Sequence, residues 1–172
     1  RIRTLDLDST LYANTYTNLD SAYSSIDLVS DPGWSYAGGR TYDWAKDNLP
    51  YRLSNNFMFY AKSSNPSRLK VHDGVTVKML KDIYIYIGHD NNRTDHAGTL
   101  EAKGATFTAL DTTKRWSGIS VYKGAGDHVF DSLTVLHTDR AFELHGEKNP
   151  TIKNSTIRYA KYGVYVHDVE LD

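Results

Sequence analysis

Apolar and polar residues alternate in short runs from residue 49 onward, and turn residues separate the runs. Strict alternation over about four to eight positions is typical of a strand that buries one face. No run in this part keeps apolar residues at helical spacing for three turns. The pattern therefore predicts an all-β fold. The expected strands are LKV, VTVKM, IYIYI, TLEA, ATFTA, GISVY, FDSLTVLH, AFELH, TIKNSTIRY and GVYVH.

The expected strands recur at a regular interval. Gly118, Ala141 and Gly163 open three similar strands at steps of 23 and 22 residues. A second series has steps of 22, 28 and 22, and its longest step contains the polar insertion DTTKRW; its members are Ile85, Phe107, Val135 and Ile157. A repeated interval of about 22 residues indicates a solenoid, in which each strand pairs with its equivalent one turn later. The sequence thus predicts parallel sheets wound into a coil.

Stacking of equivalent strands places their inward side chains in columns. The expected inner columns are Ile119, Phe142, Val164 and, beside them, Val121, Leu144, Val166. Every member is apolar, so the two columns form a continuous core.

Several runs resemble the repeats of secreted right-handed parallel β-helix proteins of the pectate-lyase-like superfamily. The runs are LKVHDGVTVKM, IYIYIG, GTLEAKGATFTA and RWSGISVY, and the matching residues are Gly74, Val75, Val77, Gly98, Leu100, Ala102, Gly104, Trp116, Gly118 and Ile119. The resemblance covers residues 49–172 and implies a right-handed parallel β-helix. It implies no single function, because that fold carries lyases, hydrolases, epimerases, adhesins and inert stalks.

Residues 1–48 follow the period weakly. IRTLDLD and SIDLV alternate like strands, whereas DPGWSYAGGR is rich in turn residues. We expect an N-terminal cap or an atypical first turn here, since terminal repeats of solenoids are irregular. The alternative is a separate small domain. It is less favoured, because so short a segment would have little hydrophobic core of its own.

The amino-acid composition limits which binding partners and which cellular location we expect. The 172 residues contain 20 Lys and Arg against 21 Asp and Glu, a formal net charge of −1, which argues against a nucleic-acid or anionic membrane partner. No cysteine is present, so disulfides and thiolate metal sites are excluded. No apolar run reaches the roughly 18 residues that a membrane span needs. With the β-helix resemblance, we expect an extracellular or cell-surface protein.

Outward side chains near the end of the chain carry the candidate chemistry. Their expected columns are Ser120, Glu143, Tyr165 and Tyr122, His145, His167, with neighbours about 4.8 Å apart. The rings could simply stack along the ladder and cover the sheet. They could instead bind a sugar chain. Two imidazoles with Glu143 and Asp168 nearby could also hold a cation or move a proton.

A second outward pair of columns is expected on the neighbouring sheet. Its members are Tyr84, Thr106, Thr134, Thr156 and Tyr86, Thr108, Leu136, Arg158. Threonine is ordinary on the outer face of a strand. The tyrosines offer a weaker carbohydrate platform. The candidate ligand-binding residues are thus Tyr84, Tyr86, Tyr122, Glu143, His145, Tyr165 and His167.

The insertion HDNNRTDHA, residues 89–97, gathers ligand-type side chains. If the loop folds back, its His89, Asp90, Asp95 and His96 could bind a divalent cation such as calcium. No EF-hand or zinc spacing is matched, and a solvated loop is the alternative.

Asn92 and Asn154 begin Asn-x-Thr patterns that fit N-glycosylation. Asn154 could instead serve a turn.

No catalytic motif is present, and no catalytic residue is assigned. Four basic residues have no evident acidic partner set: Lys78, Lys123, Arg140 and Arg158. We therefore expect a non-catalytic structural or adhesive β-helix module, as in a surface layer, filament, stalk or adhesin. The alternative is a carbohydrate-active β-helix, a polysaccharide lyase or glycoside hydrolase if it is an enzyme. Because GVYVH would leave an unpaired strand edge, we expect self-association or further turns at that end.

Overall fold

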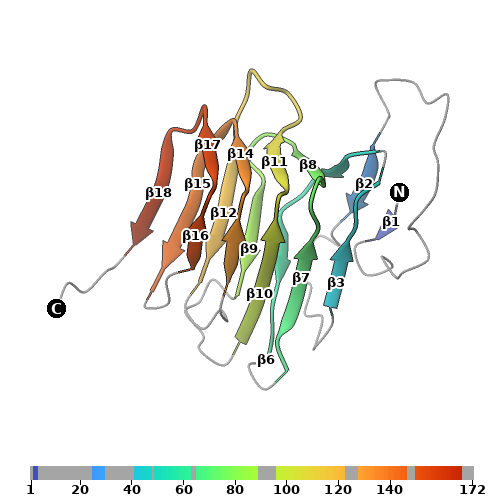
Figure 1. The fold of residues 1–172 in the computed structure, drawn as a ribbon, viewed down its shortest axis with the longest axis vertical. Helices are drawn as coiled ribbons and strands as arrows, with labels where there is room; N and C mark the ends of the chain where they lie inside the picture. Colours follow the sequence, from blue (N-terminus) through green and yellow to red (C-terminus); the bar gives the residue numbers. More distant parts are fainter. Residues whose placement is uncertain are drawn as a thin grey trace.

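The computed structural model of the chain describes residues 2–3, 25–29, 41–47, 49–62, 65–88, 96–122, 128–146 and 150–167. Every regular element in these ranges is a β-strand, and the strands form three sheets (Figure 1). The described ranges contain no helix that is long and apolar enough to cross a membrane.

We number the sheets in the order in which each coil from β3 onward passes through them. Sheet 1 contains β3 (Thr41–Trp44), β7 (Ser67–Val71), β10 (His96–Lys103), β13 (Val129–Asp131) and β16 (Thr151–Lys153). Sheet 2 contains β1 (Ile2–Arg3), β2 (Ile26–Val29), β4 (Tyr51–Leu53), β8 (Thr76–Met79), β11 (Thr106–Ala109), β14 (Thr134–Leu136) and β17 (Thr156–Arg158). Sheet 3 contains β5 (Phe57–Phe59), β9 (Tyr84–Ile87), β12 (Trp116–Val121), β15 (Thr138–His145) and β18 (Tyr162–His167). The strand β6 (Ala61–Lys62) pairs antiparallel with β10.

The chain passes through sheets 1, 2 and 3 in turn and then begins again. Its successive coils are β3-β4-β5, β7-β8-β9, β10-β11-β12, β13-β14-β15 and β16-β17-β18. Each strand of these coils pairs in parallel with its equivalent in the next coil. The predicted parallel β-helix is therefore confirmed. Within residues 1–48, β2 and β3 join the same sheets by pairing with β4 and β7.

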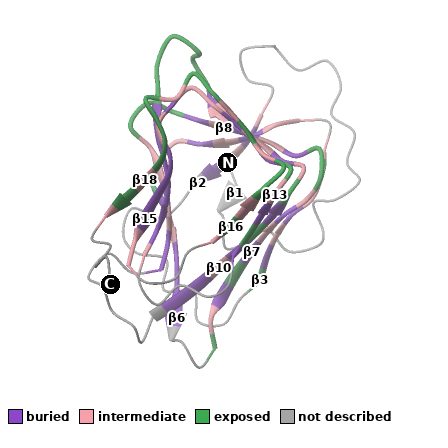
Figure 2. Ribbon diagram, turned by 60° about the vertical axis from the view of Figure 1, so that its left-hand side comes forward, coloured by how far each residue is buried: buried purple, intermediate pink, exposed green. Residues whose placement is uncertain are grey.

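The two predicted inner columns of sheet 3 are confirmed by strand register. Ile119 lies opposite Phe142, which lies opposite Val164. Phe142 is 0% exposed, whereas Val164 one coil later is 49% exposed. Figure 2 shows this change as buried β15 beside exposed β18. Removal of apolar surface from water, worth about 25 cal/mol per Å², is what holds successive coils together.

The prediction that Ile85 shares a column with Phe107 is wrong. Phe107 pairs with Val77 and Val135 in sheet 2, while Ile85 pairs with Ile119 in sheet 3. Equivalent residues of β8 and β11, such as Val77 and Phe107, are 30 positions apart because the 89–97 insertion lies between them. A constant interval of about 22 therefore assigns the wrong strand.

Tyr84 and Tyr86 consequently lie beside Gly118 and Ser120 in sheet 3, and not beside threonines in sheet 2 as predicted. The outer threonine column of sheet 2 does exist. It consists of Thr76, Thr106, Thr134 and Thr156.

The corner between sheets 1 and 2 repeats in four coils with a left-handed residue. Gly74, Gly104, Ser132 and Asn154 occupy it with positive φ. Glycine and asparagine tolerate this conformation better than most residues. Asn154 therefore forms a turn, and its Nδ2 also donates to Asp131 Oδ1 at 3.0 Å.

Candidate functional site on the outer face of sheet 3

A row of aromatic rings crosses the outer face of sheet 3. His145 and His167 are paired residues of β15 and β18, and their rings stack with centroids 4.2 Å apart and planes 9° apart. Tyr122 stacks on the other face of His145 at 4.5 Å. Parallel strands place equivalent side chains about 4.8 Å apart, which is close to the separation of stacked rings. The predicted column of Tyr122, His145 and His167 is thus present.

The row continues to β9. Tyr86 lies 6.0 Å from Tyr122 at a tilt of 35°, and Tyr84 stacks on Tyr86 at 4.9 Å. Because neighbouring rings cover one another's faces, the rings within the row turn their edges outward. A sugar ring that stacks on an aromatic needs a free face, so this arrangement favours covering of the sheet over a stacking platform.

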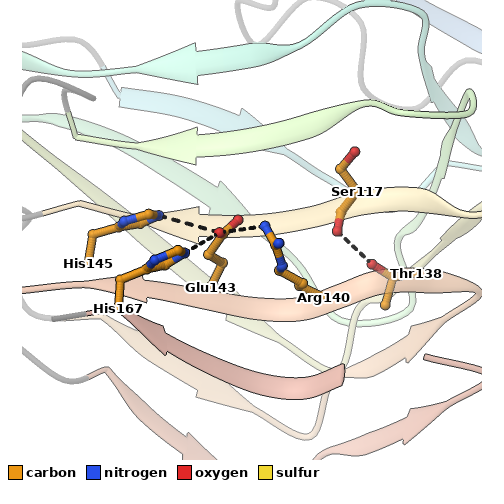
Figure 3. A network of polar contacts seen from close by, with 6 residues as sticks. All are labelled: Ser117, Thr138, Arg140, Glu143, His145 and His167. Atoms are coloured by element: carbon orange, nitrogen blue, oxygen red, sulfur yellow. Dashed lines mark hydrogen bonds and ion pairs between the residues drawn. The ribbon is translucent and has the colours of Figure 1, made fainter. Parts of the chain in front are cut away.

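A carboxylate lies beside the row and is almost fully buried. The Glu143 side chain is 6% exposed, and its Oε1 accepts hydrogen bonds from Arg140 Nη1 at 2.7 Å and from His167 Nε2 at 2.6 Å (Figure 3). His145 Nε2 lies 3.8 Å from the same oxygen. A buried carboxylate needs such partners, because an unpaired charge away from water is costly.

Arg140 and Glu143 share a face because the strand is irregular. Residues three apart in a regular strand point to opposite faces. The register between β12 and β15 shifts between Gly118 and Ile119, so Gly118 pairs with Arg140 while Ile119 pairs with Phe142. This β-bulge gives β15 one additional residue and returns the Arg140 side chain to the face that carries Glu143.

Gly118 is required at this bulge. Its φ is 138°, and an added Cβ would lie 1.7 Å from the backbone oxygen of Arg140. The residue therefore lets β12 and β15 approach closely where the register changes.

Burial and the charges of the cluster shift two pKa values. Partial burial raises the pKa of the Tyr84 phenol, and the Glu143 carboxylate acts in the same direction. Partial burial opposes the charge of Arg140, but the attraction of Glu143 and the two tyrosines Tyr84 and Tyr165 outweighs it and raises the Arg140 pKa. The guanidinium also lies 4.7 Å from the centroid of the Tyr165 ring, a cation–π contact.

The structure brings all seven predicted ligand-binding residues onto one sheet. Tyr165 lies opposite Glu143 and packs edge-on against His167 at 4.7 Å. Of the loop prediction, His89, Asp90, Asn92 and Asp95 lie outside the described residues, as does the side chain of His96. Asn154 is described at its corner, and its glycosylation stays a prediction.

Alternation along the strand gives Arg140 no acidic partner, so the sequence does not place this residue in the cluster. Period-two alternation places the side chains of Arg140 and Glu143 on opposite faces of the sheet. The signal that could have found it is Gly118, because a glycine within a strand often marks a bulge.

Ser120 is buried at an outward position next to Glu143. It lies between Tyr86 and Glu143 in strand register and is 0% exposed. Within the described part of the chain, its Oγ has no hydrogen-bond partner. The Ser120 hydroxyl can therefore still form a hydrogen bond.

The chemistry open to this face follows from its donors. One carboxylate and two imidazoles converge, with one ring nitrogen of His145, one of His167 and a Glu143 oxygen within 4.8 Å of one another. Such a set can pass a proton or bind a cation. Comparisons with protein-family models, with curated proteins and with solved structures found no match for this chain.

Proposed function

We propose that the chain is a non-catalytic structural or adhesive module of a secreted or cell-surface protein, a rigid β-helical column that another β-helical coil extends. The observation that carries the proposal is the exposure of inward residues in the coil β16-β17-β18. Val164 and Val166 are 49% and 43% exposed, whereas Phe142 and Leu144, their partners one coil earlier, are 0% and 5% exposed.

The geometry of this end selects the kind of partner. Among the residues that the structure describes, β16, β17 and β18 are each the last strand of their sheet, so three backbone edges lie around one apolar interior. Ile152 and Ile157 are also only partly buried there. A helix or a single strand could not pair with three edges at once, whereas another β-helical coil could. A second copy of this chain supplies such a coil.

The resemblance to secreted pectate-lyase-like repeats, seen in Gly74, Gly104 and Trp116, supports an extracellular or cell-surface location. The stacked ring row supports a structural role, because the rings within it cover each other. Both features suit a spacer that must keep its shape.

Sedimentation of the full chain over a wide concentration range tests this proposal. We expect the average mass to rise with concentration. Replacing Val164 and Val166 together by Lys should abolish the rise, because lysine at an edge opposes strand addition. The matched control is Val129→Lys on β13, where a side chain 44% exposed lies away from the end. A wild-type chain that stays monomeric at the highest concentration would refute the proposal.

A carbohydrate-active protein is a second candidate, favoured by the buried Glu143 with Arg140 and His167. An enzyme of this kind would cleave a polysaccharide that contains uronates. Incubation with such polymers would then give ultraviolet absorbance from an unsaturated product, and His145→Ala and His167→Ala would remove it. Absence of product from all polymers tried would leave the structural proposal as the better supported one.

A further inference from the structure

The residues Glu143, His145 and His167 offer three metal-ligand atoms from two adjacent strands. Their nearest ligand atoms lie within 4.8 Å of one another. Two imidazoles and a carboxylate form a donor set typical of zinc and other divalent first-row metals, whereas calcium prefers oxygen alone. We propose that these three side chains bind a divalent transition metal ion such as Zn²⁺.

The distances suit this proposal after a small adjustment. Zinc bonds of about 2.0–2.2 Å in a tetrahedral site place neighbouring ligand atoms about 3.4 Å apart. The Glu143 Oε1 atom is now 2.6 Å from His167 Nε2 and 3.8 Å from His145 Nε2. These values lie on either side of the required one. The two rings, whose planes are now 9° apart, must also tilt toward each other for both nitrogens to face one ion.

The orientation of the imidazoles also fits. Both Nε2 atoms point toward the Glu143 carboxylate (Figure 3). Since an ionised carboxylate only accepts, His167 Nε2 donates in this contact. Metal binding exchanges this N–H···O contact for metal–ligand bonds, and the proton moves to Nδ1 through solvent. No redox change is involved.

Arg140 orients the carboxylate from outside the donor set. Its Nη1 donates to Glu143 Oε1 at 2.7 Å and holds the side chain in place. An ionised carboxylate oxygen has more than one lone pair, so Oε1 can accept from Arg140 and still face the ring nitrogens. Groups that hold a metal ligand in position in this way are a regular part of metal sites.

The site would connect two coils. His145 and Glu143 belong to β15, and His167 belongs to β18. An ion held by all three would tie the coil β16-β17-β18 to the coil before it. This inference is independent of the proposed structural function, because it concerns the outer face of sheet 3 and not the interior of the last coil.

Calorimetric titration of the full chain with Zn²⁺ tests the proposal. We expect one strong site, and His145→Phe or His167→Phe should weaken it at least about ten-fold. Phenylalanine keeps a flat ring in the stack and removes the ligand nitrogen. The His167 side chain is 32% exposed, so its replacement should leave the fold intact. Ca²⁺ should give no heat at this site.

Two matched controls place the ion. His72 also pairs with a carboxylate, that of Asp43, but has no second imidazole beside it in the described residues, so His72→Gln should bind Zn²⁺ like the wild type. The double variant His89→Gln with His96→Gln should also bind normally. Loss of binding in that double variant, with normal binding in His145→Phe and His167→Phe, would overturn the proposal, as would a wild-type chain that binds no Zn²⁺.

A second measurement needs no substitution. Zn²⁺ should slow amide hydrogen exchange in β18 more than in β7, because β18 carries one of the ligands and β7 carries none. In nitrogen NMR, two of the seven histidines should shift on loading. Equal protection of β7 and β18 would contradict a site at this position.

Discussion

Sheets 2 and 3 surround the same core and carry different outer faces. Thr106, Thr134 and Thr156 form a plain polar column on sheet 2. The outer face of sheet 3 instead carries stacked rings and the buried Glu143. Both sheets are parallel and share the strand spacing, so the spacing alone does not set the chemistry. The inward residues fix the coil, and the outward residues are then free to differ from sheet to sheet.

The difference also has a backbone cause. The pairings of β8, β11, β14 and β17 in sheet 2 show no change of register. In sheet 3 the register of β12 and β15 shifts at Gly118. A bulge re-aims side chains, and here it adds Arg140 to the face that carries Glu143. Gly118 thus permits the bulge that brings a guanidinium to the carboxylate on this face.

The largest expected effect comes from Gly118→Ala. The new Cβ would collide with the Arg140 carbonyl oxygen at a φ of 138°, so the free energy of unfolding should fall by about 3 kcal/mol or more. Chemical denaturation measures this change. The control is Gly163→Ala on β18, where the nearest atom to an added Cβ lies 3.9 Å away, and where we expect a change within about 0.5 kcal/mol. Equal losses in the two variants would show that the bulge is not special.

A smaller effect is expected when the two outer faces are changed directly. Glu143→Gln leaves the partly buried Arg140 without its charge partner and should cost about 1–2 kcal/mol in unfolding free energy. Thr134→Val on sheet 2 should change the same quantity by no more than about 0.5 kcal/mol. If both variants proved neutral, the charge cluster would add nothing to stability beyond the threonine column.

The smallest effect is expected at the corner that leads into sheet 2. The pKa of Asp131 is lowered, first because Asn154 donates to it and then because Ser132 and Lys153 do so. The corresponding stability is present above the unfolded-state pKa and is lost as pH falls through the folded-state pKa. Asn154→Gly keeps the left-handed corner and removes the donor. NMR titration should show a higher Asp131 pKa, and stability should fall less on acidification; an unchanged pKa would contradict this account.

The inner columns of the fold were predictable because each needs only local alternation and one interval. Ile119, Phe142 and Val164 are spaced by 23 and 22 residues, and no large insertion interrupts them. The same interval places Ile85 in the wrong sheet, because the steps from β8 to β11 and from β9 to β12 are longer than 22 residues. A loop changes the interval without changing the pairing, so spacing alone cannot follow strands across an insertion.

The candidate site was predictable in part for the same reason. His145 and His167 follow the interval, and their stacking follows from strand register. Arg140 does not follow alternation, because a bulge depends on backbone geometry that residue patterns do not state. Alternation also could not predict the burial of Glu143, because side chains from neighbouring strands cover this outward position.

The polar loop at residues 111–115 joins β11 to β12 and lies on the surface. Asp111 closes it locally, accepting from the Thr113 amide at 3.0 Å through its side chain and from the Lys114 amide at 2.9 Å through its carbonyl. Both flanking strands keep their partners in the neighbouring coils despite this added length. A foreign peptide inserted there should be presented on a stiff column without loss of folding, which makes this corner a natural position for epitope display.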